Sequence, residues 1–443
     1  LAIMGSTTTV LLSLLFLFFS TSNFIPLIQS HNYSAISLNN NEGFSISLIH
    51  RDSPLSPLYN HSKTPHETRI SQLKHSISRM NYLSSLLHTP QKFSTQISYD
   101  PDSYLYIASY YIGTPAQKVF GFIDTASDLI WTNSKTSFKS GDSTSFISLP
   151  CKDKKYCQKL PSNQRTCKGD DQCTYIVTYA DGASTTGVIS QDKFQFDVSG
   201  DLGPLSFGYA NDASSEHFTG MDVNGCLGLS RVPPFSLIAQ LKINKFSHCL
   251  IKDGSKSSTM RFGSEAVIIS EKSTPLVDEP KYYHVQLEGI SVGNTKVPVR
   301  PRQLGSIYVD TGASYTMLKE TAFTPFLKLV KELVPKTAVP SPYDEDLQFC
   351  FKATEAEVKV LPKVTFHFTN VDVTFANVVT YMEIEGGIWC LAIIKSSEKD
   401  SSVLGNFQMT NLNVGYDLEQ NMMSFTSANC EASTAVGGLV QAI

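Results

Sequence analysis

The sequence has few charged residues and no excess of basic ones. Only 17% of its 443 residues are charged, and the net charge is −4, which argues against a nucleic-acid-binding protein. At 41%, hydrophobic residues are too frequent for a disordered chain. Beyond the first thirty residues there is no run of 18 apolar residues, so no membrane-spanning helix is expected in the mature chain.

The first thirty residues have the pattern of a secretory signal peptide. Residues 10–19 form an apolar core interrupted by a single serine, and small and polar residues follow at positions 20–22. We therefore expect residues 1–30 to be a signal peptide and the mature protein to be secreted.

The nine cysteines suit an oxidising compartment, where disulfides are the default state. Their spacing contains no paired C-x-x-C module, so we expect no zinc site. Nothing in the sequence implies another metal or an organic cofactor. Because nine is odd, at least one thiol stays unpaired or pairs outside the chain.

A basic, histidine-rich segment precedes an acidic body. Residues 51–92 carry six Lys or Arg side chains against two acidic ones, a net charge of +4. Residues 93–443 carry 30 basic and 37 acidic side chains, a net charge of −7. Apolar residues at helical spacing predict a helix over residues 67–87. We interpret residues 31–94 as a removable pro-segment held partly by opposite charge; an exposed helix of the folded domain is the alternative.

From residue 104 onward the pattern is one of short strands separated by turn residues. The expected strands are residues 104–112, 119–123, 175–179, 283–290, 307–309 and 364–368. Helical spacing is limited to short pieces such as 236–241 and 322–333. Many short strands separated by turn signals predict an all-β fold.

An internal repeat predicts two similar lobes. One apolar run leads into Asp-Thr-Ala-Ser starting at Asp124, and a second leads into Asp-Thr-Gly-Ala-Ser starting at Asp310. About a hundred residues after each aspartate, an apolar pair is followed by glycine, at Gly228 and at Gly405. We expect each lobe to contribute one aspartate to a shared cleft.

The repeat would bring together two carboxylates, which can act as a pair in general acid–base catalysis. Two carboxylates about 3 Å apart cannot both ionise, so they share one proton. Such a pair can hold a water between its oxygens, one carboxylate taking the water's proton while the other polarises a peptide carbonyl. Small residues after each aspartate let backbone N–H groups approach the carboxylates, and the hydroxyls of Thr125 and Thr311 can tie the two loops together.

These motifs resemble those of the pepsin-like aspartic proteases (peptidase family A1), and within them the plant nepenthesin-type branch. The resemblance covers almost the whole chain. It rests on GFS and LIHRDSPL within residues 43–55, IGTP (112–115), DLIWT (128–132), CTY and YADG within 173–182, KFSHCL (245–250), LEGISVG (287–293), LGN (404–406) and a terminal cysteine at 430.

The resemblance implies a bilobal fold with a catalytic cleft between an N-terminal lobe (95–278) and a C-terminal lobe (279–443). It implies a secreted aspartic endopeptidase that is made as a zymogen, inhibited by its own pro-segment and monomeric. Its partner would be a polypeptide substrate, and its location the apoplast or, alternatively, a vacuole.

The resemblance also assigns roles to single residues. Asp124 and Asp310 match the catalytic dyad, Tyr179 matches the flap tyrosine that closes over substrate, and Trp131 matches the indole whose N–H can hold that phenol. Further residues match those that support the dyad: Thr125, Ser127, Thr311 and Gly312.

Disulfides follow in part from the same resemblance, which implies the bridges Cys350–Cys390 and Cys249–Cys430. Four further cysteines are expected to form two more bridges, with three possible connectivities: Cys151, Cys157, Cys167 and Cys173. Cys226 is left over, and we expect it to be a small buried hydrophobe without a redox role.

Several alanines depart from the family pattern near the expected site. Ala126 replaces a glycine beside the first aspartate, Ala180 and Ala183 alter the flap, and Ala313 lacks a hydroxyl that often accompanies the second aspartate. The alternative function is therefore a weak or inactive homologue that binds peptides or inhibits another enzyme, since a fold alone does not decide function.

Overall fold

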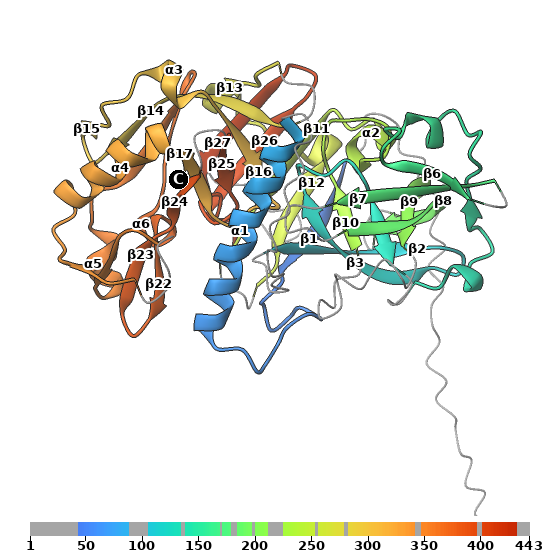
Figure 1. Cartoon of the computed structure of the whole chain (residues 1–443), viewed down its shortest axis with the longest axis horizontal. Coiled ribbons are helices and arrows are strands. Elements are labelled where there is room, and N and C mark those ends of the chain that lie inside the picture. Colours follow the sequence, from blue (N-terminus) through green and yellow to red (C-terminus); the bar gives the residue numbers. More distant parts are fainter. Residues whose placement is uncertain are drawn as a thin grey trace, which may run out of the picture. The chain divides into compact units, whose positions relative to one another are not determined.

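The computed structural model describes residues 43–87, 105–133, 138–168, 171–178, 184–196, 200–210, 225–252, 256–278, 282–341, 347–396 and 401–431. These residues form three sheets and few helices (Figure 1), so the fold is all-β and bilobal, as predicted. The expected signal peptide, the flap tyrosine Tyr179 and the flap alanines Ala180 and Ala183 lie outside the described residues.

The largest sheet has 15 strands, in the order β13-β27-β26-β11-β12-β1-β2-β3-β10-β4-β9-β8-β7-β6, with β5 paired to β8. Its strands are β1 (Phe44–His50), β2 (Tyr106–Ile112), β3 (Gln117–Asp124), β4 (Trp131–Asn133), β5 (Ile147–Ser148), β6 (Arg165–Lys168), β7 (Gln172–Thr178), β8 (Ser184–Phe196), β9 (Gly200–Ala210), β10 (Gly225–Gly228), β11 (Lys245–Cys249), β12 (Ser258–Phe262), β13 (Ser273–Pro275), β26 (Leu412–Asp417) and β27 (Met422–Ser427). Because β26 pairs with β11, this sheet joins both halves of the chain.

The C-terminal half builds two further sheets of eight and four strands. The first contains β14 (His284–Val292), β15 (Thr295–Lys296), β16 (Ser306–Asp310), β17 (Thr316–Lys319), β20 (Val364–Phe368), β21 (Val371–Thr374), β24 (Ile393–Ser396) and β25 (Ser402–Gly405). The second contains β18 (Ala338–Val339), β19 (Cys350–Lys352), β22 (Tyr381–Glu385) and β23 (Ile388–Leu391). Each of the strands predicted from the sequence is present, with ends shifted by a few residues.

The longest described helix is α1 (Pro65–Leu87), which contains the predicted helix 67–87. It begins at a reciprocal cap, because Thr64 Oγ1 accepts from the N–H of Glu67 while the Glu67 carboxylate accepts from the N–H of Thr64. The shorter helices are α2 (Leu237–Leu241), α3 (Pro301–Leu304), α4 (Glu320–Leu333), α5 (Glu355–Lys359) and α6 (Asn377–Thr380).

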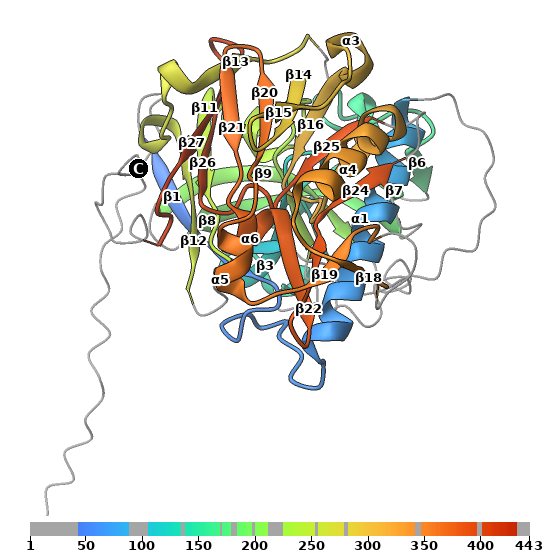
Figure 2. The ribbon, with the colours of Figure 1, turned by 90° about the vertical axis from the view of Figure 1, so that its left-hand side faces the viewer.

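One face of α1 is buried although it is largely polar. Gln72, Ser76 and Arg79 recur at helical spacing, and all three are buried, with Leu73 and Met80 beside them. Figures 1 and 2 show α1, in blue, beside the strands of the C-terminal half, and it packs against β22. A buried arginine needs a partner of opposite charge, so this face points to a specific contact.

The strand β1 was not predicted from the sequence. It lies inside the largest sheet, pairing with β12 on one side and β2 on the other. Phe44, Ile46, Leu48 and His50 alternate with less buried residues, which is the period-2 pattern of a strand with one face in the core. The expected pro-segment therefore contributes a strand as well as a helix.

Candidate active site

Asp124 and Asp310 occupy equivalent places in the two halves. Asp124 ends β3 and pairs with Gly228 of the parallel strand β10, while Asp310 ends β16 and pairs with Gly405 of the parallel strand β25. These pairings account for the repeated apolar–apolar–glycine element of the sequence.

Both glycines are required because the chain after each aspartate folds back over them. A Cβ at Gly228 would lie 2.6 Å from the carbonyl oxygen of Leu129, and one at Gly405 would lie 2.5 Å from that of Tyr315. A side chain at either position would push the aspartate loop out of place.

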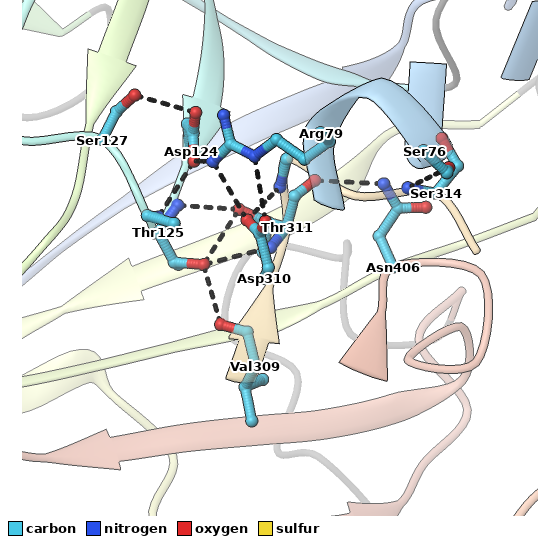
Figure 3. A network of polar contacts seen from close by, with 12 residues as sticks. Ser76, Arg79, Asp124, Thr125, Ser127, Val309, Asp310, Thr311, Ser314 and Asn406 are labelled. Atoms are coloured by element: carbon cyan, nitrogen blue, oxygen red, sulfur yellow. Dashed lines mark hydrogen bonds and ion pairs between the residues drawn. The ribbon is translucent and has the colours of Figure 1, made fainter. Parts of the chain in front are cut away.

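The two aspartate loops are tied together by their threonines (Figure 3). The N–H of Thr125 donates to Thr311 Oγ1 (3.1 Å), and the N–H of Thr311 donates to Thr125 Oγ1 (3.0 Å). Each hydroxyl also donates to the opposite strand, Thr125 to the carbonyl of Val309 and Thr311 to that of Ile123. This reciprocal bonding fixes the separation of the two carboxylates and confirms the tie predicted between the loops.

The hydrogen bonds to the two carboxylates are not symmetric. Asp124 accepts from the N–H of Ala126 (2.9 Å) and from the hydroxyl of Ser127 (2.8 Å). Asp310 accepts from the N–H of Gly312 (2.8 Å), whereas Ala313, at the place of Ser127, has no hydroxyl to donate. Within its own loop, Asp124 therefore accepts one hydrogen bond more than Asp310 does.

Arg79 of α1 bridges both carboxylates (Figure 3). Its Nη2 donates to Asp124 Oδ1 at 2.5 Å, and its Nε donates to Asp310 Oδ2 at 3.0 Å. All three side chains are buried. One planar guanidinium thus contacts two carboxylates that lie 186 positions apart in the sequence.

Within this buried cluster, the pKa values of Asp310 and Arg79 are shifted. Burial raises the pKa of Asp310, and the charge of Asp124 adds to that shift, while the charge of Arg79 opposes it. Burial alone would lower the pKa of Arg79, but the charges of Asp124 and Asp310 outweigh it and raise that pKa above its ordinary value. Arg79 therefore stays protonated while it contacts the carboxylates.

A second contact of α1 lies one turn before Arg79. Ser76 Oγ accepts from the backbone N–H groups of Ser314 (3.2 Å) and Tyr315 (3.0 Å), just after the second aspartate loop. The same hydroxyl donates to the carbonyl of Gln72 (3.0 Å). Ser76 was not predicted as a site residue because no motif marks it; only the helical spacing that places it on the face of Arg79 could have suggested it.

Three further residues support the site: Gly312, Asn406 and Trp131. The side chains of Asp124 and Arg79 leave no room for a side chain at Gly312, where an added Cβ would lie 2.9 Å from Asp124 Oδ1 and 3.0 Å from Arg79 Nη2. Asn406, within the LGN motif, donates to the carbonyl of Thr311 (3.0 Å) and so braces the second loop. Trp131 lies in β4 with only 2% of its surface exposed, in a core cluster that includes Phe122. Its expected contact with the flap tyrosine involves a residue outside the described part of the chain.

The cysteines form four disulfides in the described residues. Cys249–Cys430 and Cys350–Cys390 are the pairs that the resemblance implies, and the connectivity left open by the sequence is Cys151–Cys167 and Cys157–Cys173. Cys226 is a free, buried thiol in β10. Burial raises the pKa of this thiol, which keeps it protonated and unreactive.

Within the described residues, no group of three or more His, Cys, Asp or Glu side chains is arranged to hold a metal ion. A search of the same residues finds no helix with the length and hydropathy needed to cross a membrane.

Comparisons with known proteins agree on the family. Residues 106–264 match the profile described as Xylanase inhibitor N-terminal, and residues 282–427 match Xylanase inhibitor C-terminal. A "Probable aspartic protease" of Arabidopsis thaliana is 31% identical over 433 residues, which cover 88% of this chain and 95% of that protein. Aspartic proteinase nepenthesin-2 of Nepenthes gracilis is 30% identical over 394 residues, which cover 84% and 87%.

Solved structures share the fold at lower identity. Basic 7S globulin from soybean aligns with a TM-score of 0.62 at 16% identity, over 75% of this chain and 93% of that one. Conglutin gamma, a basic 7S globulin from lupine seeds, aligns with a TM-score of 0.61 at 19% identity, over 73% and 91%.

Proposed function

Because the chain belongs to the pepsin-like aspartic protease family, in its nepenthesin-type branch, we propose that it is a secreted aspartic endopeptidase made as a zymogen. The observation that carries the proposal is the convergence of Asp124 and Asp310 on one guanidinium group. Carboxylates that can share Arg79 can equally share one water molecule once Arg79 has left.

The reaction follows from the unequal surroundings of the two carboxylates. Burial raises the pKa of Asp310, so in this proposal Asp310 carries the proton that the pair shares. Asp124 takes a proton from the bound water while the oxygen of that water attacks the peptide carbonyl carbon. Asp310 gives its proton to the carbonyl oxygen. Asp124 then gives its proton to the amide nitrogen, which leaves as the C–N bond breaks, and a hydroxyl of the tetrahedral intermediate returns a proton to Asp310.

The pro-segment acts in this proposal as an intramolecular inhibitor. While α1 is in place, Arg79 occupies the position of the reacting water. Ser76 accepts hydrogen bonds from the backbone N–H groups of Ser314 and Tyr315, so these are not available to a substrate. Removal of residues 31–94 would free the dyad between an N-terminal lobe (95–278) and a C-terminal lobe (279–443). The mature enzyme would be a monomer that cleaves polypeptides in the apoplast or in a vacuole.

A second candidate function is that of a weak or inactive homologue which binds peptides or inhibits another enzyme. Ala126 beside the dyad and the description of the matching family profile favour it. The intact dyad, both threonine ties and the arginine aimed at both carboxylates favour the protease.

The two candidates are separated by assaying the purified full chain. After incubation at pH 4, we expect cleavage of a denatured protein substrate, and we expect none from Asp124→Asn or Asp310→Asn. Tight binding of a peptide that carries a hydroxyl in place of the scissile carbonyl, without any cleavage, would favour the binding protein. At pH 7, Arg79→Met should bind this peptide better than the wild-type chain does, because latency depends on that contact.

A further inference from the structure

Lys252, three residues after β11, has an incompletely used ammonium group. Its Nζ donates to the carbonyl of Val378 (3.0 Å) and lies 5.3 Å from the centre of the Phe407 ring. Among the described residues this carbonyl is its one hydrogen-bond acceptor, although an ammonium group has three donors. The other two donors have no partner in the described part of the chain.

Lys252 lies beside the N-terminal half of α1. The Phe407 ring under Lys252 stacks on Tyr315 at 6.5 Å, and the Tyr315 hydroxyl donates to the carbonyl of Arg69 in α1 (3.5 Å). Burial and the nearby charge of Arg69 lower the pKa of Lys252 to about 8, although Glu355 and Glu383 pull it the other way. Arg69 thus places a like charge next to Lys252 while the pro-segment is docked.

The contacts of α1 indicate where a substrate would run. Arg79 occupies the dyad, and Ser76 Oγ accepts from the N–H groups of Ser314 and Tyr315, as a peptide carbonyl of a bound substrate would. From Arg79 to Arg69 the helix rises about 15 Å, at about 1.5 Å per residue. An extended peptide covers that distance in about four to five residues, at about 3.3 Å each.

We propose that Lys252 is a specificity-determining residue that selects an acidic side chain in the substrate, about four to five residues from the scissile bond. The inference rests on the proposed protease function and adds a substrate preference to it. When α1 leaves, Arg69 leaves with it, and the like charge that it places near Lys252 is removed. A glutamate at that position replaces a repulsive contact by a charge-assisted hydrogen bond.

The neighbouring carboxylates of Glu355 and Glu383 do not accept hydrogen bonds from the Lys252 ammonium group in the described residues. They act on this lysine only through their charge. A substrate glutamate is ionised above about pH 4.3, and Lys252 stays protonated below about pH 8. The preference should therefore be strongest near pH 6 and fade toward pH 3.

The test uses the acid-processed enzyme and pairs of peptides that differ only by Glu or Gln, at each position three to six residues from the scissile bond on either side. At pH 6 we expect glutamate to raise kcat/KM about tenfold at one position, an effect of the size of a hydrogen bond to a charged group. Lys252→Met should abolish that ratio, and Lys252→Glu should reverse it in favour of the Gln peptide. Lys256→Met, at a half-exposed lysine four residues further on, is the matched control and should keep the ratio.

The outcomes separate a failure of the protease function from a failure of the role of Lys252. If the wild-type enzyme cleaves none of the peptides, the proposed protease function fails. If it cleaves them with equal kcat/KM for Glu and Gln at every position, or if Lys252→Met keeps the preference, the role of Lys252 is wrong while the protease function stands.

Discussion

At the scale of single residues, the two aspartate loops differ in the pair of residues directly after each Asp-Thr. Ala126 corresponds to Gly312, and Ser127 corresponds to Ala313. Backbone N–H groups of both loops reach their carboxylates at nearly the same distance, 2.9 Å from Ala126 and 2.8 Å from Gly312. The differences are therefore confined to one methyl group and one hydroxyl, and each can be tested by substitution.

The effect of the Ala126 methyl group on catalysis can be tested with substitutions at Ala126 and at the corresponding Gly312. A Cβ at Gly312 would lie 2.9 Å from Asp124 Oδ1, so Gly312→Ala should displace that carboxylate and lower kcat about 100-fold, the scale of a ~1 Å misplacement. Ala126→Gly removes the equivalent methyl beside the dyad and should raise kcat severalfold with KM nearly unchanged, because peptide binding extends over many contacts. Steady-state kinetics on one peptide measures both; a loss of activity in Ala126→Gly would show that the surroundings have adapted to the methyl.

The missing hydroxyl at Ala313 should appear in the pH profile. Ser127 donates to Asp124 Oδ2, while Ala313 is completely buried and cannot donate to Asp310. Ala313→Ser adds a donor of the same size as Ser127, and a hydrogen bond to an ionised carboxylate lowers its pKa. Because the carboxylates titrate as a pair, the basic edge of the profile should move down by about half a unit to one unit. The measurement is kcat/KM from pH 2 to 7; superimposable profiles would refute the role of Ala313.

Residue chemistry explains which site residues the sequence could identify. Asp124, Asp310 and the two threonines were predicted because a repeat displays them at matched positions. Arg79 was counted only as one of the six basic residues in the segment 51–92. Charge counts give the sign of an attraction but not the side chain that makes the contact, since that depends on which face α1 turns inward.

At the scale of elements, the pro-segment is held at two places by different means. The strand β1 contributes backbone pairing and buried apolar side chains, and the helix α1 contributes the polar contacts of Arg79 and Ser76. His50 ends β1, and its Nδ1 accepts from the N–H of Asp52 (3.2 Å). The junction of the two elements is therefore sensitive to protonation.

We predict that His50 makes docking of the pro-segment weaker in acid. Burial, followed by the charges of Arg69 and Arg51, lowers its pKa from 6.5 to about 3. The released histidine binds a proton below pH 6.5 and the docked one does not, so docking loses about 1.4 kcal/mol per pH unit between pH 6.5 and about 3. The raised pKa of Asp52, which burial causes, acts in the opposite direction at pH values above 3.8.

The consequence for activation can be measured by N-terminal sequencing after incubation at a series of pH values. We expect cleavage between residues 87 and 103, most of which lie outside the described part of the chain, with an onset below about pH 6. His50→Gln should move that onset at least one pH unit lower. An onset that does not move would show that another group controls release.

A Ser–His–Asp relay also joins β14, β20 and β21 of the eight-stranded sheet. Ser291 Oγ lies 2.7 Å from His367 Nε2, and His367 Nδ1 lies 2.7 Å from Asp372 Oδ1. Gly289 and Gly293 flank Ser291 in a G-x-S-x-G spacing, but Ser291 lies inside β14 and is 6% exposed, not on a turn between a strand and a helix.

We expect this relay to be structural. A serine-directed fluorophosphonate should leave Ser291 unlabelled, as judged by mass spectrometry of the intact protein. Ser291→Ala should lower the free energy of unfolding by about 1 kcal/mol, the usual contribution of one hydrogen bond. Labelling that is lost in Ser291→Ala would identify a nucleophile and overturn this interpretation.

At the scale of the whole molecule, sequence patterns predicted the local elements better than their assembly. The strand runs, the helix 67–87 and the two-lobed repeat were readable because each depends on neighbouring residues. The pairing of β26 with β11 and the insertion of β1 between β12 and β2 were not, because these contacts join distant segments. The disulfide Cys249–Cys430, which begins at the end of β11, also joins residues 181 positions apart. It was predicted from the family resemblance and not from the spacing of the cysteines.

The whole body should lose stability in acid because it buries neutral histidines. Burial lowers the pKa of His248 to about 3, and burial with the charge of Arg231 lowers that of His284 to about 4. Both take up a proton below pH 6.5 in the unfolded chain but not in the folded one. The stabilisation is therefore complete above pH 6.5 and is lost as the pH falls, by about 1.4 kcal/mol per unit for each histidine.

Urea unfolding of the full chain at pH 7, 5.5 and 4 measures this effect, in an Asp124→Asn background that prevents self-cleavage. We expect the free energy of unfolding to fall across the series, and His248→Gln to reduce the slope by up to about 1.4 kcal/mol per pH unit. The raised pKa of Asp310, which burial causes, opposes the trend, because a folded carboxyl that binds its proton more readily gains stability as the pH falls. A slope that His248→Gln leaves unchanged would mean that this ring takes up its proton in the folded state. In that case the hydrogen bond between His248 Nε2 and the Tyr416 hydroxyl (3.2 Å), and not burial, would control its titration.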